Sequence, residues 1–239
     1  MRRRLACGSG WPTCNDAAGS AAARVAPVMT ESLTDKAYHA LEEEIVTLRI
    51  PPGTVVSEAI LSRRLGVGRT PVREALQRLA REWLVTILPR RGIVVTEIDP
   101  VRQLRLLEVR REIERLLARS AARRASAEQR EAFGLIADGM DAAGATNDDL
   151  SFMRLDRAFN QLMLDSAGNE FAASAMSLMN GLSRRFWYMH YKRAADLPLA
   201  ARLHGAIARA VAGCDEAAAG EASDALVGYI QSFARATIG

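Results

Sequence analysis

Apolar residues in the first third of the chain recur at helical spacing in three stretches. The first stretch runs from Leu33 to Leu48 and stops at the helix-breaking segment RIPPG. A short second helix follows Ser57, a suitable N-cap, and ends at Gly66. The third helix is predicted to have Thr70 as N-cap and Pro71 as its first residue. Its apolar face consists of Val72, Ala75, Leu76 and Leu79.

Two short apolar segments after the third helix favour strands. LVTIL (84–88) and GIVVTEI (92–98) are connected through PRRG, which gives a hairpin with a basic tip. Three helices followed by a two-stranded hairpin define a winged helix-turn-helix. In that motif the first residues of the second helix of the pair lie nearest the base edges. Those residues are Arg69, Thr70 and Arg73, and the wing residues Arg90 and Arg91 can reach phosphate or the minor groove.

The rest of the chain has helical periodicity only, so the fold class is mainly α with an antiparallel all-α bundle. Asp99 and Pro100 restart a helix, and Ser126–Gln129 forms a capping box for the next. The apolar face of the first of these helices consists of Val101, Leu104, Leu107, Ile113, Leu116 and Leu117. Further helices are predicted to begin near Asp148, Asn169, Leu199 and Asp215. The predicted domains are 31–98, a winged helix-turn-helix that binds DNA, and 99–239, an all-α bundle.

Charge supports a nucleic-acid partner locally rather than globally. The net charge of +4 comes mostly from arginines in the first 24 residues of the 239-residue chain. Between residues 60 and 92, however, eight arginines face only Glu74 and Glu82. Such clustering is typical of a phosphate-binding surface, and a solvated arginine face is the alternative. The eight are Arg63, Arg64, Arg69, Arg73, Arg78, Arg81, Arg90 and Arg91.

The amino-terminal residues 1–30 are rich in Ala, Gly and Ser without periodicity, and we expect them to be a disordered tail. They lack the continuous apolar region that a signal peptide requires. Met29 is an alternative start of translation. No apolar run in the chain is long enough to span a bilayer. Cys7, Cys14 and Cys214 have neither disulfide nor metal-ligand spacing, which favours a reducing cytoplasm.

The segment PPGTVVSEAILSRRLGVGRTPVREALQRLAREWLV…PRRG resembles the signature of GntR-type transcription regulators, over most of residues 33–97. The resemblance implies that DNA is contacted by Arg69, Thr70, Arg73, Arg91 and Gly92. Two positions depart from the signature. Gly68 stands where serine or threonine is usual, and Trp83 stands where glycine is usual. Because glycine suits a positive φ, the tryptophan predicts a differently bent wing.

The second half resembles the helical domain (FCD domain) of the FadR-type branch of the same family. The resemblance implies that 99–239 binds a controlling small molecule (an effector) and dimerises. The segments that carry the resemblance are LLEVRREIERLLARSAA, LDRAFNQLMLDSAGN and LHGAIARAVAGCDEAAAGEASDAL. That branch commonly binds a divalent metal through an aspartate, a histidine four residues later and two further histidines. Asp156 and His204 match two of these ligands, whereas Asn160 and Leu226 stand at or near the other two. Zinc, nickel or manganese could be held with water in the remaining positions, but the incomplete set favours a metal-free site.

The resemblance also implies an arginine for an effector carboxylate. Arg110 is the matching residue, and a guanidinium suits bidentate capture of a carboxylate. The alternative is that Arg110 points outward and pairs with Glu114. His204 could likewise be a core histidine, and Arg184 or Arg185 could line the pocket. The expected effector-binding residues are Arg110, Asp156, Asn160, Arg185 and His204.

These patterns predict a regulator that binds specific DNA sequences, most simply a homodimeric repressor released by a small organic acid. Two alternatives are a metal-dependent enzyme and a non-specific DNA-binding protein. An enzyme would need a nucleophile with its base or a complete metal set, and Asp156 with His204 provides neither. A non-specific DNA-binding protein would leave the helical domain, more than half of the chain, unexplained.

Overall fold

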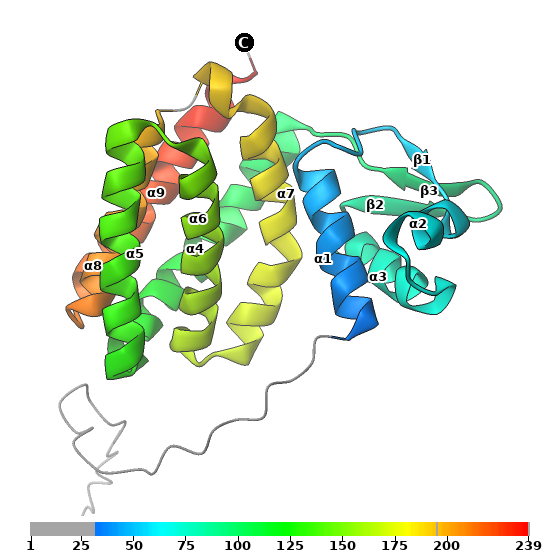
Figure 1. Cartoon of the computed structure of the whole chain (residues 1–239). Helices are drawn as coiled ribbons and strands as arrows, with labels where there is room; N and C mark the ends of the chain where they lie inside the picture. The colour runs from blue at the N-terminus through cyan, green and yellow to red at the C-terminus, as the bar shows by residue number, and fades with distance from the viewer. Residues whose placement is uncertain (1–31, 195, 239) are drawn as a thin grey trace, which may run out of the picture.

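The structure, a computed structural model, describes residues 32–194 and 196–238. The predicted tail, the alternative start at Met29 and two of the cysteines therefore lie outside the described residues. The first half contains α1 (Leu33–Val46), β1 (Val55–Val56), α2 (Glu58–Leu65), α3 (Arg69–Arg81), β2 (Val85–Leu88) and β3 (Gly92–Val95). The second half contains α4 (Pro100–Arg124), α5 (Ala127–Thr146), α6 (Asp149–Ala167), α7 (Glu170–Ala194), α8 (Leu197–Ala212) and α9 (Glu216–Ala236) (Figure 1).

The helix-turn-helix is confirmed, with one correction at the start of α3. Ser57 caps α2 by accepting a hydrogen bond from the Ile60 amide, and Gly66 ends the helix in the left-handed region with φ 66°. The prediction that Thr70 is the N-cap of α3 is wrong. Gly68 is the N-cap, because its extended backbone (φ −63°, ψ 163°) lets its carbonyl accept the first helical hydrogen bond. Arg69 and Thr70 therefore lie within the first turn of α3.

The wing is a three-stranded antiparallel sheet in the order β1-β3-β2, so the two-stranded prediction is incomplete. Strand β1 has only two residues, which is too short to produce a visible alternation of apolar and polar positions. At the tip of the wing, Arg90 and Gly92 have φ of 62° and 100°. Trp83 keeps the positive φ (56°) that glycine would favour, so the backbone conformation at this point does not depend on glycine.

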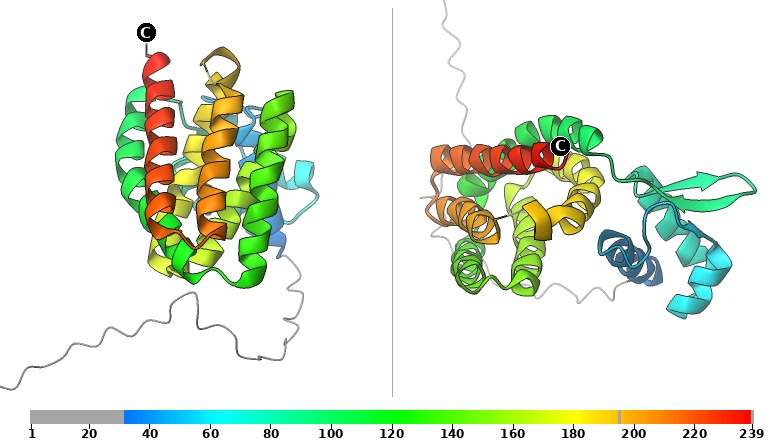
Figure 2. Two further views of the ribbon diagram at one scale, coloured as in Figure 1. Left: turned by 90° about the vertical axis from the view of Figure 1, so that its left-hand side faces the viewer. Right: turned by 90° about the horizontal axis from the view of Figure 1, so that it is seen from above.

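In the described residues of the second half the regular secondary structure is all α-helix, as predicted (Figure 2). Asp99 caps α4, and Ser126 forms the predicted capping box with Gln129. Helix α8 begins two residues before the predicted start. The predicted apolar face of α4 is partly wrong, because Val101 and Leu116 are each 46% exposed. None of the described helices is long and apolar enough to cross a membrane.

Helix α7 of the second half packs against α1 of the first half (Figures 1 and 2). Each half has its own apolar core, and Leu182 of α7 packs against the core of the first half. A Cβ atom on Gly181 would lie 2.7 Å from Cδ1 of Leu84, so the absence of a side chain permits this close approach. The bundle therefore contacts the winged helix-turn-helix directly through one face of α7.

Candidate DNA-binding surface and effector cavity

Five of the six residues predicted to contact DNA are exposed. Arg69, Thr70 and Arg73 are exposed on the first turns of α3, while the opposite face of that helix is buried. Arg90 and Arg91 are exposed at the tip of the wing, and Gly92 is partly buried at the start of β3. Guanidinium groups are thus available at the start of a helix and on a hairpin. A winged helix-turn-helix uses the helix to contact bases in the major groove and the hairpin to contact phosphate.

Glu58 of α2 orients one of these arginines, which sequence reasoning missed. Arg73 donates from Nε to Oε1 of Glu58 and from Nη2 to Oε2, both at 2.8 Å. The hydrogen bonds from Arg73 lower the pKa of Glu58. Both side chains are accessible to water, so this ion pair contributes little to stability and mainly fixes the direction of the guanidinium.

A cavity of about 230 Å³ lies in the helical half and extends to the winged helix-turn-helix. This volume is below the range of roughly 300–1,000 Å³ typical of drug-sized ligands, so the cavity suits a small molecule. Its walls come from α4, α6, α7, α8 and α9, with further residues from α1 and α3. The apolar part of the lining includes Phe152, Met153, Phe159, Met163 and Trp187.

Asp156, Asn160 and His204 form one hydrogen-bonded cluster in the cavity wall. His204 Nδ1 lies 2.8 Å from the carbonyl of Ala200, and because a carbonyl only accepts, Nδ1 carries a proton. His204 Nε2 lies 3.2 Å from Asp156 Oδ1, and Asn160 Nδ2 donates to the same oxygen at 3.0 Å. Burial raises the pKa of Asp156, but the charge and hydrogen bond of His204 outweigh it and lower that pKa. Burial lowers the pKa of His204, but the hydrogen bond to Asp156 and the charge of that carboxylate outweigh burial and raise this pKa.

This cluster does not fit a resident metal. No group of three or more His, Cys, Asp or Glu side chains within residues 32–194 and 196–238 could hold an ion. Leu226, near the position of the expected last histidine, lines the cavity but has no donor atom. Two strong ligands are fewer than the three or four protein ligands that zinc takes in proteins. The Asp156–His204 ion pair satisfies both groups without an ion.

Arg110 lies inside the cavity wall and is already paired. Its Nε donates to Oε1 of Glu114 at 2.6 Å, and Nη2 contacts the same oxygen. The predicted i,i+4 pairing is therefore present, but the alternative that Arg110 points outward is wrong, since Arg110 is only 8% exposed. An anion that enters the cavity would meet a guanidinium held in place by Glu114.

The two consecutive arginines of α7 point to different places. Arg184 lines the cavity and donates from Nη1 to Oε1 of Glu42 at 2.6 Å. Arg185 is 2% exposed and holds the segment before α4, donating to the Thr96 carbonyl at 2.9 Å and the Thr96 hydroxyl at 3.0 Å. Burial lowers the pKa of Arg185 to about 10. The expectation that Arg185 lines this cavity is therefore wrong. Of the two arginines, Arg184 is the one that lines it.

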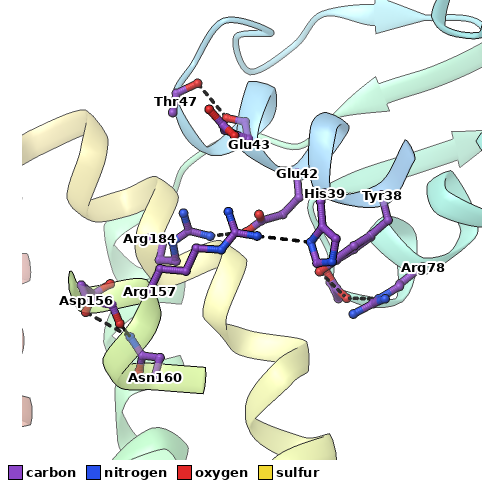
Figure 3. Close-up of polar contacts among 11 residues, drawn as sticks. Tyr38, His39, Glu42, Glu43, Thr47, Arg78, Asp156, Arg157, Asn160 and Arg184 are labelled. Carbon is purple, nitrogen blue, oxygen red and sulfur yellow. Dashed lines mark hydrogen bonds and ion pairs between the residues drawn. The ribbon is translucent and has the colours of Figure 1, made fainter. Parts of the chain in front are cut away.

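Residues of the winged helix-turn-helix contribute to the cavity, which sequence reasoning also missed (Figure 3). Tyr38 and Glu42, four residues apart on α1, and Arg78 of α3 line it. The Tyr38 hydroxyl donates to Glu82 at 2.8 Å, while the Arg78 guanidinium lies 3.6 Å from the centre of the Tyr38 ring. Burial raises the pKa of the Glu82 carboxyl. The cavity is thus connected to the end of the recognition helix through one polar network.

Comparison with known proteins agrees with this architecture. Residues 33–95 match the family model of bacterial regulatory proteins of the gntR family, and residues 105–228 match the FCD domain. An HTH-type transcriptional regulator from the TAR-I ttuE-ttuC′ intergenic region of Agrobacterium vitis is 33% identical over 55% of this chain and 78% of its own length. The HTH-type transcriptional repressor RspR of Escherichia coli is 29% identical over 73% of this chain and 77% of its own length.

Solved structures support the same fold. Escherichia coli McbR/YncC, 16% identical, aligns with a TM-score of 0.74 over 88% of this chain and all of its own chain (100%). A putative GntR regulator from Rhodococcus, 20% identical, aligns with a TM-score of 0.63 over 85% of this chain and 97% of its own. The fold and surface define a winged helix-turn-helix regulator with a helical effector domain. The chain belongs to the GntR family and is an HTH-type transcriptional regulator with an FCD domain.

Proposed function

We propose that this regulator is a cytoplasmic repressor that binds its operator as a homodimer and is released by a small organic acid. The observation that carries the proposal is the composition of the cavity wall. Four arginines line the cavity, against the three carboxylates Glu42, Glu114 and Asp156. Glu82 pairs with Arg78 from outside the lining, so the wall is close to neutral, but its guanidinium groups still offer N–H donors to an anion. The participation of α1 and α3 lets that anion act on the DNA-binding half. The arginines are Arg78, Arg110, Arg157 and Arg184.

The proposed effector-binding residues are Arg110, Arg184, Asn160 and His204. Arg110 supplies charge from α4, and Asn160 supplies an amide group beside Asp156. Both ring nitrogens of His204 are already paired, so His204 would contact the ligand through its ring and hold Asp156 in place. The apolar remainder of the wall suits a short hydrocarbon body. Repression is proposed because the Escherichia coli relative RspR is named a repressor.

The test of effector class is a thermal-unfolding screen of purified protein with organic acids, each paired with its neutral amide. A ligand that binds only the folded state raises the melting temperature. We expect at least one acid to raise it while its amide does not. A screen in which acids and amides act equally would contradict an anion site.

Removal of metal should have no effect. Because Asp156 and His204 pair directly with each other, prolonged chelation should leave both the melting temperature and the acid-driven release from DNA unchanged. Elemental analysis of protein purified without a metal-affinity tag provides the control. Stoichiometric zinc, nickel or manganese, lost together with the acid response in Asp156→Ala, would overturn this prediction.

The proposed homodimer follows from the size of the DNA-binding surface. A single recognition helix reads only a few base pairs, so two symmetric half-sites are needed for a specific operator. Light scattering should give the mass of two chains, both for the free protein and for its DNA complex. The mass of one chain in both states would exclude the homodimer.

A further inference from the structure

Two polar side chains on α7 line the cavity and lack hydrogen-bond partners for buried atoms. Asn180 Oδ1 and Arg184 Nε are both buried with no partner among the described residues. Both residues line the cavity, and at positions i and i+4 of one helix they face the same way. Because an unpartnered buried polar atom costs free energy, a molecule that accepts from Arg184 and donates to Asn180 is favoured there.

The other side of Arg184 is bound to the DNA-binding half. Its Nη1 donates to Glu42 of α1 at 2.6 Å, and Glu42 is only 6% exposed (Figure 3). The charge of Arg184 also helps to lower the pKa of Asp156, so its field reaches the effector cluster. One guanidinium therefore lies between the carboxylate of α1 and the interior of the cavity.

We propose that Asn180 and Arg184 form a second polar subsite, which binds a 2-hydroxy carboxylate in competition with Glu42. The hydroxyl group donates to Asn180 Oδ1, and the carboxylate accepts from Arg184. This inference rests on the proposed control by an organic acid and specifies the chemistry of that acid. In this proposal Asn180 selects ligands that carry the hydroxyl group. Glu42 couples binding of the ligand to the DNA-binding half.

The competition has a consequence for the recognition helix. A ligand carboxylate shares the positive charge of Arg184 and so weakens the contact of α1 with α7. Tyr38 lies one turn before Glu42 on α1 and is hydrogen-bonded to Glu82 at the end of α3. A change in the position of α1 therefore reaches α3. Coupling is reciprocal, so removal of the Glu42 charge must strengthen acid binding if Glu42 competes with the acid.

The hydroxyl selection is tested by calorimetric titration of the full chain with mandelate and phenylacetate, which differ by one hydroxyl. The parent should bind mandelate about tenfold more tightly, as one hydrogen bond to a buried partner provides. Asn180→Leu should abolish that preference. Ser177→Ala is the matched control, because Ser177 lines the same cavity but its hydroxyl already donates to the Ser174 carbonyl at 2.8 Å.

The competition is tested with Glu42→Gln, which should bind both acids several-fold more tightly than the parent. Its control is Glu43→Gln on the same helix, since Glu43 contacts exposed Arg49 at 3.4 Å. Arg184→Lys keeps a positive charge beside Glu42 but loses the planar fork, so it should fold and bind both acids about tenfold more weakly.

Equal affinity of the parent for the two acids, or a preference that survives in Asn180→Leu, would overturn the subsite. Unchanged affinity in Glu42→Gln would overturn the competition. Absence of binding by either acid would overturn both parts of the inference. A rise in the melting temperature with another acid, but not with its amide, would in that case still support the proposed control by an organic acid, so the two failures are distinguishable.

Discussion

Replacing Arg69 or Arg73 with alanine is expected to weaken operator binding about 5- to 160-fold while leaving non-specific binding nearly unchanged. The reason is that a bidentate arginine–guanine contact contributes roughly 1–3 kcal/mol of discrimination between bases. Both side chains are exposed at the start of α3, and Glu58 holds Arg73 in a fixed direction. Fluorescence anisotropy with operator and scrambled duplexes measures the two affinities.

Arg90→Ala and Arg91→Ala should behave differently, because the wing arginines are expected to contact phosphate. Each should weaken binding to all sequences and reduce the slope of log affinity against log salt by about 1. Arg202→Ala, an exposed arginine on α8, is the control that should change neither. If Arg69→Ala and Arg73→Ala bound the operator as tightly as the parent, the placement of α3 in the groove would be wrong.

Arg110→Ala is expected to abolish acid-driven release from DNA and also to destabilise the helical domain. Removing one partner of a buried ion pair leaves the other charge uncompensated, which typically costs about 3–5 kcal/mol. In Arg110→Ala the uncompensated charge is that of Glu114, whose side chain is 13% exposed. Urea unfolding measures the loss of stability, and operator release by the acid found in the thermal screen measures the response.

The double variant Arg110→Ala, Glu114→Ala separates these two effects. With both charges removed, much of the lost stability should return, whereas the response to the acid should remain absent. The experiment therefore asks whether Arg110 acts on the ligand or only on the fold. A double variant that released DNA like the parent would show that Arg110 does not bind the acid.

Local signals in the sequence predicted the elements well because their physical causes are local. Ser57, Asp99 and Ser126 each cap a helix through a hydrogen bond to a residue two or three positions later. Thr70 failed as a cap because Gly68 caps through its backbone conformation, which leaves no side-chain signature. Strand β1 was missed because its pairing with β3 connects residues far apart in the chain.

The site was predicted less completely because its arrangement depends on packing between the two halves. Whether Arg184 or Arg185 enters the cavity depends on the rotation of α7 against its neighbours, and periodicity alone does not fix that rotation. The contributions of Tyr38 and Glu42 depend on α1 lying beside α7. The contact between Arg184 and Glu42, which are 142 residues apart in the chain, has no counterpart in any local pattern.

Binding of the purified full chain to the DNA upstream of its own gene tests whether this protein is a sequence-specific regulator. It should be measured at about 0.15 M salt with excess competitor DNA, where purely electrostatic binding is weak. We expect a stable complex that resists the competitor and dissociates when the acid found in the thermal screen is added. If the competitor removed this binding as readily as it removes binding to random DNA, the protein would not be a sequence-specific regulator of its own gene.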